Sequence, residues 1–249
     1  MTADGEAVLD LLDEAAAAIA TAVDALDDRG LAGTKPWQYR TDLAADAAAA
    51  EVLDGAGVGV LSEESGLRNA DAEVVVVLDP VDGSTNAARG VPWFATSLCA
   101  VDAVGPLAAL VVNLATGERF DAVRGIGARR NGRPIEPSAT SALGESIVGF
   151  SGYPPRYLGW RQYRALGALA LDLCAVASGV LDGYLDCSPS AHGVWDYLGG
   201  ALICAEAGAT VSDAEGRSLV VLDPDARRTP VAGGTVALHD ELLALRTTW

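Results

Sequence analysis

Two aspartates three positions apart are the most informative chemical groups in this sequence. Asp79 and Asp82 lie in the segment Asp79–Asn86 (DPVDGSTN), directly after the apolar run Val74–Leu78. That run is rich in β-branched residues and therefore indicates a buried central strand. Carboxylates that are close together and poorly hydrated repel each other, and a bound cation relieves the repulsion. The segment predicts a cation site, and an acidic turn that caps a helix is the alternative.

The turn inside this segment offers a way to bind phosphate. Pro80 restricts the backbone and Gly83 permits a sharp turn, so both carboxylates can approach one point. The amides of Gly83 and Ser84 would face the same point and could bind a phosphate at the start of a helical turn. An EF-hand fits badly, because Gly90 stands where that loop needs a glutamate. A phospho-aspartate phosphatase also fits badly, because its two aspartates are separated by one residue and not by two.

Three further carboxylates occupy the ends of predicted elements. Glu63 follows a short predicted strand at 58–61, Asp42 begins a predicted helix at 42–53, and Asp196 begins another at 195–207. Taken singly, Glu63 fits a polar loop, and Asp42 and Asp196 fit helix N-caps. If the strands before Glu63 and Asp79 are parallel neighbours, both carboxylates project from one sheet edge. In combination these groups predict a shared metal site.

The residue inventory limits which metal this site can bind. Only two histidines are present, His192 and His239, and no cysteine pair has zinc-binding spacing. The four cysteines are expected to be buried free thiols. Carboxylate oxygens therefore remain as ligands, and they favour Mg²⁺, Mn²⁺ or Ca²⁺.

The remaining pattern predicts a layered mixture of helices and strands that is not a simple doubly wound sheet. A first helix is expected from Val8 to Leu26, ending before Gly30, and Asn131-Gly132 predicts a hairpin turn. Pro137 and Ser138 are expected to divide an N-terminal half, 1–138, from a C-terminal half, 139–249. Other expected strands are 96–101, 107–113, 119–123, 147–150, 181–187 and one from 210, and other expected helical segments are 161–168 (helix or turn) and 172–178.

The charge balance excludes a basic binding face. The net charge is −17, and Lys35 is the single lysine beside sixteen arginines, so binding to nucleic acid or to an anionic membrane surface is not expected. The acidic N-terminus lacks the order of a signal peptide, and no apolar run approaches the ~20 residues of a membrane helix. We expect a cytoplasmic protein and hypothesise that this cytoplasm is rich in salt.

The quoted residues resemble the inositol monophosphatase superfamily. Asp79–Asn86 is similar to its signature D-P-[ILV]-D-G-[ST]-x-N, and Trp195-Asp196 followed by Glu206–Gly208 is similar to its second signature. Segment 62–66 (SEESG) resembles the family's Glu-Glu segment, whereas Thr41-Asp42 matches a third motif only loosely. Segments 86–92 and 113–117 are similar to those of the archaeal branch, which hydrolyses inositol phosphates and fructose 1,6-bisphosphate.

This resemblance implies a layered α-β-α-β-α sandwich, of the α+β or α/β class, that forms a homodimer. It implies an Mg²⁺-dependent phosphomonoesterase of carbohydrate metabolism, including gluconeogenesis, that acts on fructose 1,6-bisphosphate, inositol 1-phosphate or both. Water activated by two metal ions would attack without a covalent enzyme intermediate. A third Mg²⁺ and substitution by Mn²⁺ stay open. The alternatives are a 3′(2′),5′-bisphosphate nucleotidase and a non-catalytic regulatory protein on the same fold.

The resemblance also assigns roles to individual residues. Glu63, Asp79 and the Val81 carbonyl would bind the first metal ion, and Asp79, Asp82 and Asp196 the second. Asp42 and Ser84, with Glu63, would orient and deprotonate the water. The implied substrate contacts are Asp82, Gly83, Ser84, Arg164, Gly167, Leu169 and Asp196. The chain departs from the family at Pro189, in the loop 35–40 and at 167–169 (GAL), which leaves substrate choice and the third metal unsettled.

The excess of carboxylates predicts that salt stabilises this protein. Repulsion among them acts over about 10 Å at 0.1 M salt and over about 3 Å at 1 M. We therefore expect the melting temperature to rise when KCl is increased from millimolar to molar concentration, as measured by circular dichroism. A melting temperature that does not rise with KCl would contradict the hypothesis of a salt-rich cytoplasm.

Overall fold

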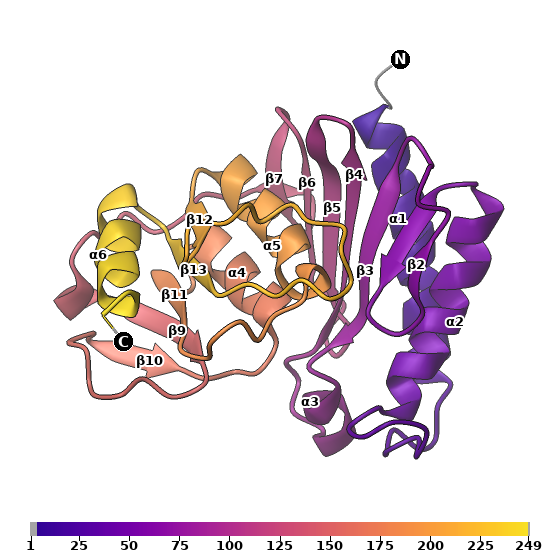
Figure 1. Ribbon diagram of the computed structural model, residues 1–249, viewed down its shortest axis with the longest axis horizontal. Helices are drawn as coiled ribbons and strands as arrows, with labels where there is room; N and C mark the ends of the chain where they lie inside the picture. Colours follow the sequence, from indigo (N-terminus) through magenta and orange to yellow (C-terminus); the bar gives the residue numbers. More distant parts are fainter. Residues whose placement is uncertain (1–3, 249) are drawn as a thin grey trace.

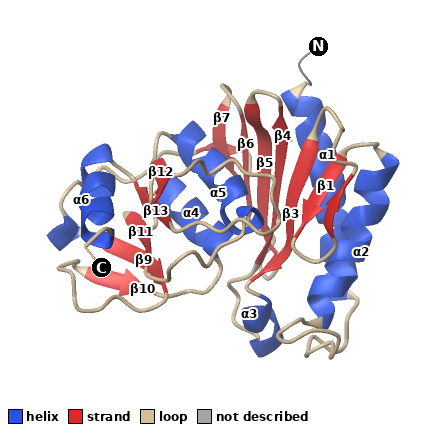
Figure 2. Ribbon diagram, in the orientation of Figure 1, coloured by secondary structure: helices blue, strands red, loops and turns tan. Residues whose placement is uncertain are grey.

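Two β-sheets and three layers of helix make up this protein (Figures 1 and 2). The computed structural model describes residues 4–248. Its elements are α1 (Gly5–Asp24), α2 (Arg40–Gly55), β1 (Gly59–Ser62), β2 (Gly66–Arg68), β3 (Val75–Asp82), α3 (Ser84–Arg89), β4 (Ala95–Asp102), β5 (Gly105–Asn113), β6 (Arg119–Val123), β7 (Gly127–Arg130), β8 (Arg133–Pro134), a 3₁₀ turn (Leu143–Glu145), β9 (Ile147–Ser151), β10 (Gln162–Arg164), α4 (Leu169–Ala177), β11 (Gly183–Asp186), α5 (Val194–Ala207), β12 (Thr210–Asp213), β13 (Pro230–Gly233) and α6 (Val236–Arg246).

The first sheet has eight strands in the order β2-β1-β3-β4-β5-β6-β7-β8. From β3 to β8 it is an antiparallel meander, whereas β1 runs parallel to β3. Helices α1 and α2 pack on one face, and α4 and α5 pack on the other. The strand β3 is buried almost throughout because helices cover both of its faces, which explains its unbroken apolar sequence.

The second sheet has five strands in the order β10-β9-β11-β13-β12. Helices α4 and α5 separate it from the first sheet, and α6 covers its outer face. The layers therefore follow the order α-β-α-β-α, which confirms the predicted sandwich. All strands of the first sheet precede residue 138 and all strands of the second follow it, but the division into two halves stays a prediction. No helix among residues 4–248 is long and apolar enough to cross a membrane.

Local sequence explains the outer and inner helices in different ways. The outer helix α1 begins where the Asp4 side chain accepts a hydrogen bond from the Glu6 amide. It buries one stripe of apolar residues at three- and four-residue steps against the first sheet. The inner helix α5 is apolar on nearly every side because it lies between two sheets.

Close approach in the middle layer depends on glycine. A Cβ atom on Gly200 of α5 would lie 2.6 Å from the Cβ atom of Leu173 in α4. A Cβ atom on Gly199 would lie 2.8 Å from the hydroxyl oxygen of Ser97 in β4. The small residues of α5 therefore set its distance both from α4 and from the first sheet.

Several sequence-based expectations are wrong in detail. The segment 161–168 contains the short strand β10 and no helix. Strand β3 continues through Asp79 to Asp82, because a bulge keeps it paired with β4. Neither Asp42 nor Asp196 is an N-cap: Tyr39 and Gly193 take those positions. The sequence pattern does not predict helix α6 or strand β13.

Substitution of Gly200 tests the tight packing between α4 and α5. The Gly200→Ala variant should lower the free energy of unfolding by about 1–3 kcal/mol, because the added methyl group overlaps the Leu173 side chain. Urea denaturation measures the change. Gly55→Ala is the matched control, because a Cβ atom there meets nothing within 4 Å. Equal stability of the two variants would refute the packing argument.

Candidate active site

Parallel pairing of β1 and β3 brings the first two carboxylates together. Ser62 is opposite Leu78, and the Glu63 amide donates a hydrogen bond to the Leu78 carbonyl at 3.1 Å. Glu63 and Asp79 therefore leave neighbouring strands at the same level. This confirms the expectation that both project from one edge of parallel strands.

The bulge in β3 brings Asp82 to the same face of the sheet. Asp79 is opposite Ser97 and Asp82 is opposite Ala95, so three steps along β3 match two steps along β4. In a regular strand, residues three apart point to opposite faces. The extra residue restores the alternation, and Pro80, which lacks an amide hydrogen, lies within the bulge.

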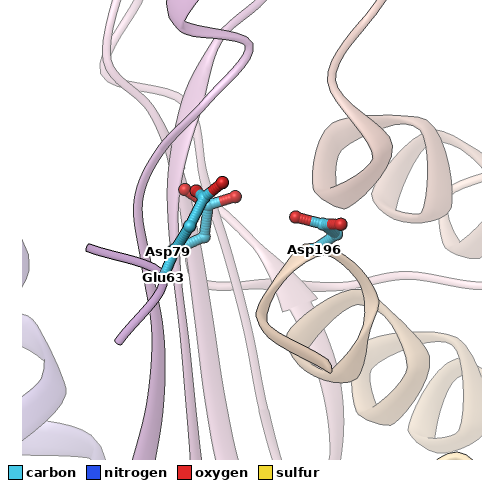
Figure 3. Close-up of side chains that lie close together, drawn as sticks. All are labelled: Glu63, Asp79 and Asp196. Atoms are coloured by element: carbon cyan, nitrogen blue, oxygen red, sulfur yellow. The ribbon is translucent and has the colours of Figure 1, made fainter. Parts of the chain in front are cut away.

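The third member of the cluster comes from the first turn of α5. The Asp196 carboxylate accepts a hydrogen bond from the Gly193 amide at 2.9 Å. Oxygen atoms of Glu63, Asp79 and Asp196 all lie within 4.8 Å of one another. Figure 3 shows Glu63 and Asp79 side by side on the sheet and Asp196 facing them from the helix.

The electrostatics of this cluster favour a bound cation. Burial, followed by the charges of Glu63 and Asp82, raises the pKa of Asp79. Glu63 reaches solvent, but protein atoms crowd around it, and this loss of hydration together with Asp196 raises its pKa to about 8. The Asp79 Oδ1 atom is buried and has no hydrogen-bond partner among residues 4–248. An unpartnered carboxylate oxygen in an all-oxygen cluster fits Mg²⁺ or Mn²⁺.

A second group forms beside this cluster around Ser84. The buried Asp42 carboxylate accepts a hydrogen bond from the Tyr39 amide at 2.8 Å. Burial raises the pKa of Asp42 to about 6, although hydrogen bonds from Tyr39 and Ser84 act against this increase. The Ser84 hydroxyl has a single proton, and the Val81 carbonyl at 3.2 Å is the alternative acceptor for it. The structure therefore brings the predicted Asp42–Ser84 pair together.

Asp82 faces the start of α4. Its Oδ2 atom accepts a hydrogen bond from the Ala170 amide at 2.6 Å. Burial, followed by Asp196, raises the pKa of Asp82. Asp82 is not part of the three-carboxylate cluster, and its role as a metal ligand stays a prediction.

The segment before α4 packs on the turn after β3. The Asn86 side chain donates hydrogen bonds to the Trp93 carbonyl at 2.7 Å and to the Leu166 carbonyl at 2.8 Å. Gly83 has φ of 86°, and a Cβ atom there would lie 3.1 Å from the Gly167 carbonyl oxygen. Glycine is required at position 83 both by its conformation and by this close approach.

Two predicted substrate contacts, Leu169 and Arg164, are not joined to the carboxylate cluster by any contact described above. Leu169 is buried at the start of α4. Arg164 is exposed on β10 and bonds to the Tyr163 carbonyl and the Gln162 side chain, and no hydrogen bond or ion pair joins it to the carboxylate cluster within 4–248. The substrate roles of both residues stay predictions.

Sequence reasoning missed the part played by His192. Its Nδ1 atom lies 3.2 Å from Asp196 Oδ2, and its Nε2 atom lies 3.6 Å from Asp186 and 3.2 Å from the Ser151 hydroxyl. Burial acts to lower the pKa of His192. The neighbouring Asp196 and Asp186 act to raise it and outweigh burial, so the net shift of the pKa is upward. His192 precedes Gly193, the N-cap of α5, so helical periodicity gave no signal for its role.

This chain is similar to known proteins in both sequence and fold. Residues 37–248 match the Inositol monophosphatase family. The fructose-1,6-bisphosphatase/inositol-1-monophosphatase of Archaeoglobus fulgidus is 35% identical over 209 residues, or 82% of this chain and 81% of that protein. The Nus factor SuhB of Pasteurella multocida is 33% identical over 172 residues, or 63% of each chain. The solved structure of inositol monophosphatase from Anabaena has a TM-score of 0.79 and 28% identity, and covers 97% of this chain and 96% of that chain.

The raised pKa values predict how stability depends on pH without metal. Carboxyl groups ordinarily titrate near pH 4, whereas Glu63 titrates at about 8 in the folded chain and the pKa of Asp79 is also raised. The folded state therefore keeps protons that the unfolded state has lost, and the free energy of unfolding should fall as pH rises from about 4 to about 8. Urea denaturation in EDTA across this range measures the slope.

Two substitutions test whether the carboxylate cluster causes this dependence of stability on pH. Asp79→Asn removes one of the mutually repelling charges and should flatten the decline. Asp71→Asn changes an exposed aspartate and is the control. The slope of the free energy of unfolding against pH should be the same in this variant as in the unmodified protein. Equal slopes in the Asp79→Asn variant and the unmodified protein would rule out the cluster as the cause.

Proposed function

This chain belongs to the inositol monophosphatase family, and from that premise we propose that it hydrolyses a small sugar or inositol phosphate with Mg²⁺. The named phosphatases among its relatives identify it as a phosphoric monoester hydrolase. Fructose 1,6-bisphosphate is the first proposed substrate and inositol 1-phosphate the second, because a relative 35% identical is named for both activities. A role in gluconeogenesis would follow from the first.

One observation carries the proposal above all others. Glu63, Asp79 and Asp196 hold oxygen atoms within 4.8 Å of one another, and one oxygen of buried Asp79 has no partner within 4–248. Packing alone does not account for this arrangement, because the nearby charges raise the pKa values of Glu63 and Asp79. A divalent cation would compensate these charges and use the unpartnered oxygen.

Glu63, Asp79 and Asp196 would bind the metal, and Asp82 and the Val81 carbonyl are further candidate ligands. The bound ions would supply Lewis acidity toward the phosphate and the attacking water. The Val81 carbonyl is an alternative acceptor for the Ser84 hydroxyl at 3.2 Å, and Asp82 accepts from the Ala170 amide. Each of these groups keeps acceptor capacity beyond the bond that it makes.

Asp42 and Ser84 would handle the proton of the attacking water. The pKa of Asp42 is raised to about 6 by burial, so its carboxylate is largely ionised at pH 7 and still basic enough to accept a proton. The Ser84 hydroxyl lies between Asp42 and the Val81 carbonyl and could orient the water. The Gly83 and Ser84 amides would bind the phosphate.

Two other functions deserve direct tests. A 3′(2′),5′-bisphosphate nucleotidase would use the same carboxylates on a larger substrate. A regulatory role is suggested by the likeness to a protein named as a Nus factor. A purely regulatory protein would be expected to have lost metal ligands, whereas Glu63, Asp79 and Asp196 are all present here. The homodimer, the cytoplasmic location and the third metal ion also remain proposals.

A substrate panel tests the proposed function. Phosphate release with Mg²⁺ should be fastest with fructose 1,6-bisphosphate or inositol 1-phosphate and should stop in EDTA. Faster release from 3′-phosphoadenosine 5′-phosphate would favour the nucleotidase. An absence of release from all three, at both low and molar KCl, would contradict the proposed substrates.

A substitution tests the role of Asp79. Asp79→Asn should lower kcat by about a thousandfold or more, which is ~4 kcal/mol of barrier, while circular dichroism shows an intact fold. Asp225→Asn is the matched control, because this aspartate is exposed, and it should retain full activity. Asp79→Asn activity within about tenfold of the unmodified protein would refute the assignment.

A further inference from the structure

The loop after β9 and the strand β10 enclose a pocket that the proposed chemistry does not use. Its volume is about 620 Å³, which is in the range of small-molecule sites, roughly 300–1,000 Å³. It lies where β9 and β10 form the edge of the second sheet, at the end of the molecule remote from α1 and α2 (Figure 1). Its principal lining residues are Phe150, Tyr153, Arg156, Tyr157, Trp160 and Tyr163.

Aromatic rings form the wall of this pocket. The rings of Phe150 and Tyr163 are stacked with centroids 5.1 Å apart, and Trp160 lies 5.6 Å from Phe150. Tyr157 meets the edge of Trp160 at 5.7 Å, and its hydroxyl donates to the Trp160 carbonyl. These contacts hold the rings in fixed positions, yet Tyr157 and Tyr163 remain 67% and 56% exposed. The rings of Phe150 and Trp160 are buried behind them, so the exposed rings of Tyr157 and Tyr163 are the ones that suit a flat aromatic ligand.

The charge around the pocket is opposite to that of the whole protein. The segment 146–171 contains three arginines and no aspartate or glutamate, in a chain of net charge −17. Many arginines elsewhere pair with carboxylates. Arg156, by contrast, is exposed and makes no hydrogen bond or ion pair within the part of the chain that the structure describes. A free guanidinium at a pocket rim suits a phosphate.

We propose that this pocket binds a nucleoside monophosphate, with the base against the exposed rings of Tyr157 and Tyr163, which the buried Trp160 supports, and the phosphate at Arg156. A sugar phosphate offers the anion but no flat ring for the aromatic wall. A free nucleoside offers the ring but nothing for the guanidinium. The proposal does not rest on the proposed phosphatase function, because none of these groups belongs to the carboxylate cluster.

Chains of neighbouring residues connect the pocket to the region of the carboxylate cluster. Ser151, between Phe150 and Gly152, contacts His192 at 3.2 Å, and His192 contacts Asp196. At the other end of the pocket, Ala165 is followed by Leu166, whose carbonyl accepts from Asn86. Binding must therefore be measured apart from catalysis, and for that reason metal is removed in the experiment.

Isothermal titration calorimetry in EDTA tests the proposal with the full chain. AMP is expected to bind at one site per chain with Kd of about 1 mM or tighter. Ribose 5-phosphate, which lacks the base, and adenosine, which lacks the phosphate, should each bind at least about tenfold more weakly. The Asp79→Asn variant should bind AMP as the unmodified protein does, which separates this site from the carboxylate cluster.

Variants assign the binding to the pocket. Tyr163→Ala and Arg156→Gln should each weaken AMP binding by about tenfold, whereas Tyr163→Phe keeps the ring and should bind normally. Arg133→Gln is the matched control for Arg156→Gln, because Arg133 is exposed on the first sheet. Circular dichroism establishes that each variant is folded.

Three results would overturn the proposal. The first is no AMP binding at millimolar concentration, and the second is equal binding of AMP and ribose 5-phosphate. The third is a pocket that a second copy of the chain covers. Analytical ultracentrifugation would then show a dimer that the Tyr163→Ala substitution dissociates, and AMP binding would be the same in this variant as in the unmodified protein.

Discussion

Repulsion among carboxylates that converge on one point is the constraint on which this structure depends. Glu63, Asp79 and Asp196 come from three separate elements, and their oxygen atoms lie within 4.8 Å of one another. Such a group opposes folding in the absence of a counter-charge, because Asp79 is buried and crowding by protein atoms removes much of the water that would screen its neighbours. Rigid elements on both sides must therefore hold it in place.

The packing supplies that rigidity. The sheet side is held by the parallel pairing of β1 with β3 and by the bulge opposite β4. The helix side is held by α5, whose glycines at 199 and 200 let it approach both β4 and α4 closely. The apolar layers thus provide the stability that the site itself lacks, which is a common relation between a functional site and its scaffold.

The acidic character of the chain is not uniform, and the exceptions are informative. Carboxylates converge at Glu63, Asp79 and Asp196, and His192 links Asp196 to the deeper Asp186. Around the aromatic pocket, carboxylates are absent from 146–171. The carboxylate cluster and the aromatic pocket therefore differ in local charge within one strongly acidic chain.

Much of this protein could be predicted from its sequence, because local patterns dominate there. The apolar stripe of α1 predicts a helix buried on one face, and the unbroken apolar run of β3 predicts a strand buried on both faces. The small residues of α5 indicate close packing, and the structure has this helix buried. The motif residues Asp79, Asp82 and Ser84 and the turn at Gly83 are close together in the chain, so the sequence alone places them in one region, although not on one face of the sheet.

Tertiary structure decided what depends on distant pairing. Strand β10 at 162–164 has three exposed residues and no apolar periodicity, so only its partner β9 makes it a strand. The bulge that returns Asp82 to the face of Asp79 exists only opposite β4. His192 belongs to the site because α5 packs against the second sheet, which brings this side chain beside Asp186 and Ser151. The sequence by itself determined which groups could do chemistry; which of them meet was decided by packing, because residues far apart in the chain become neighbours only through the layers between them.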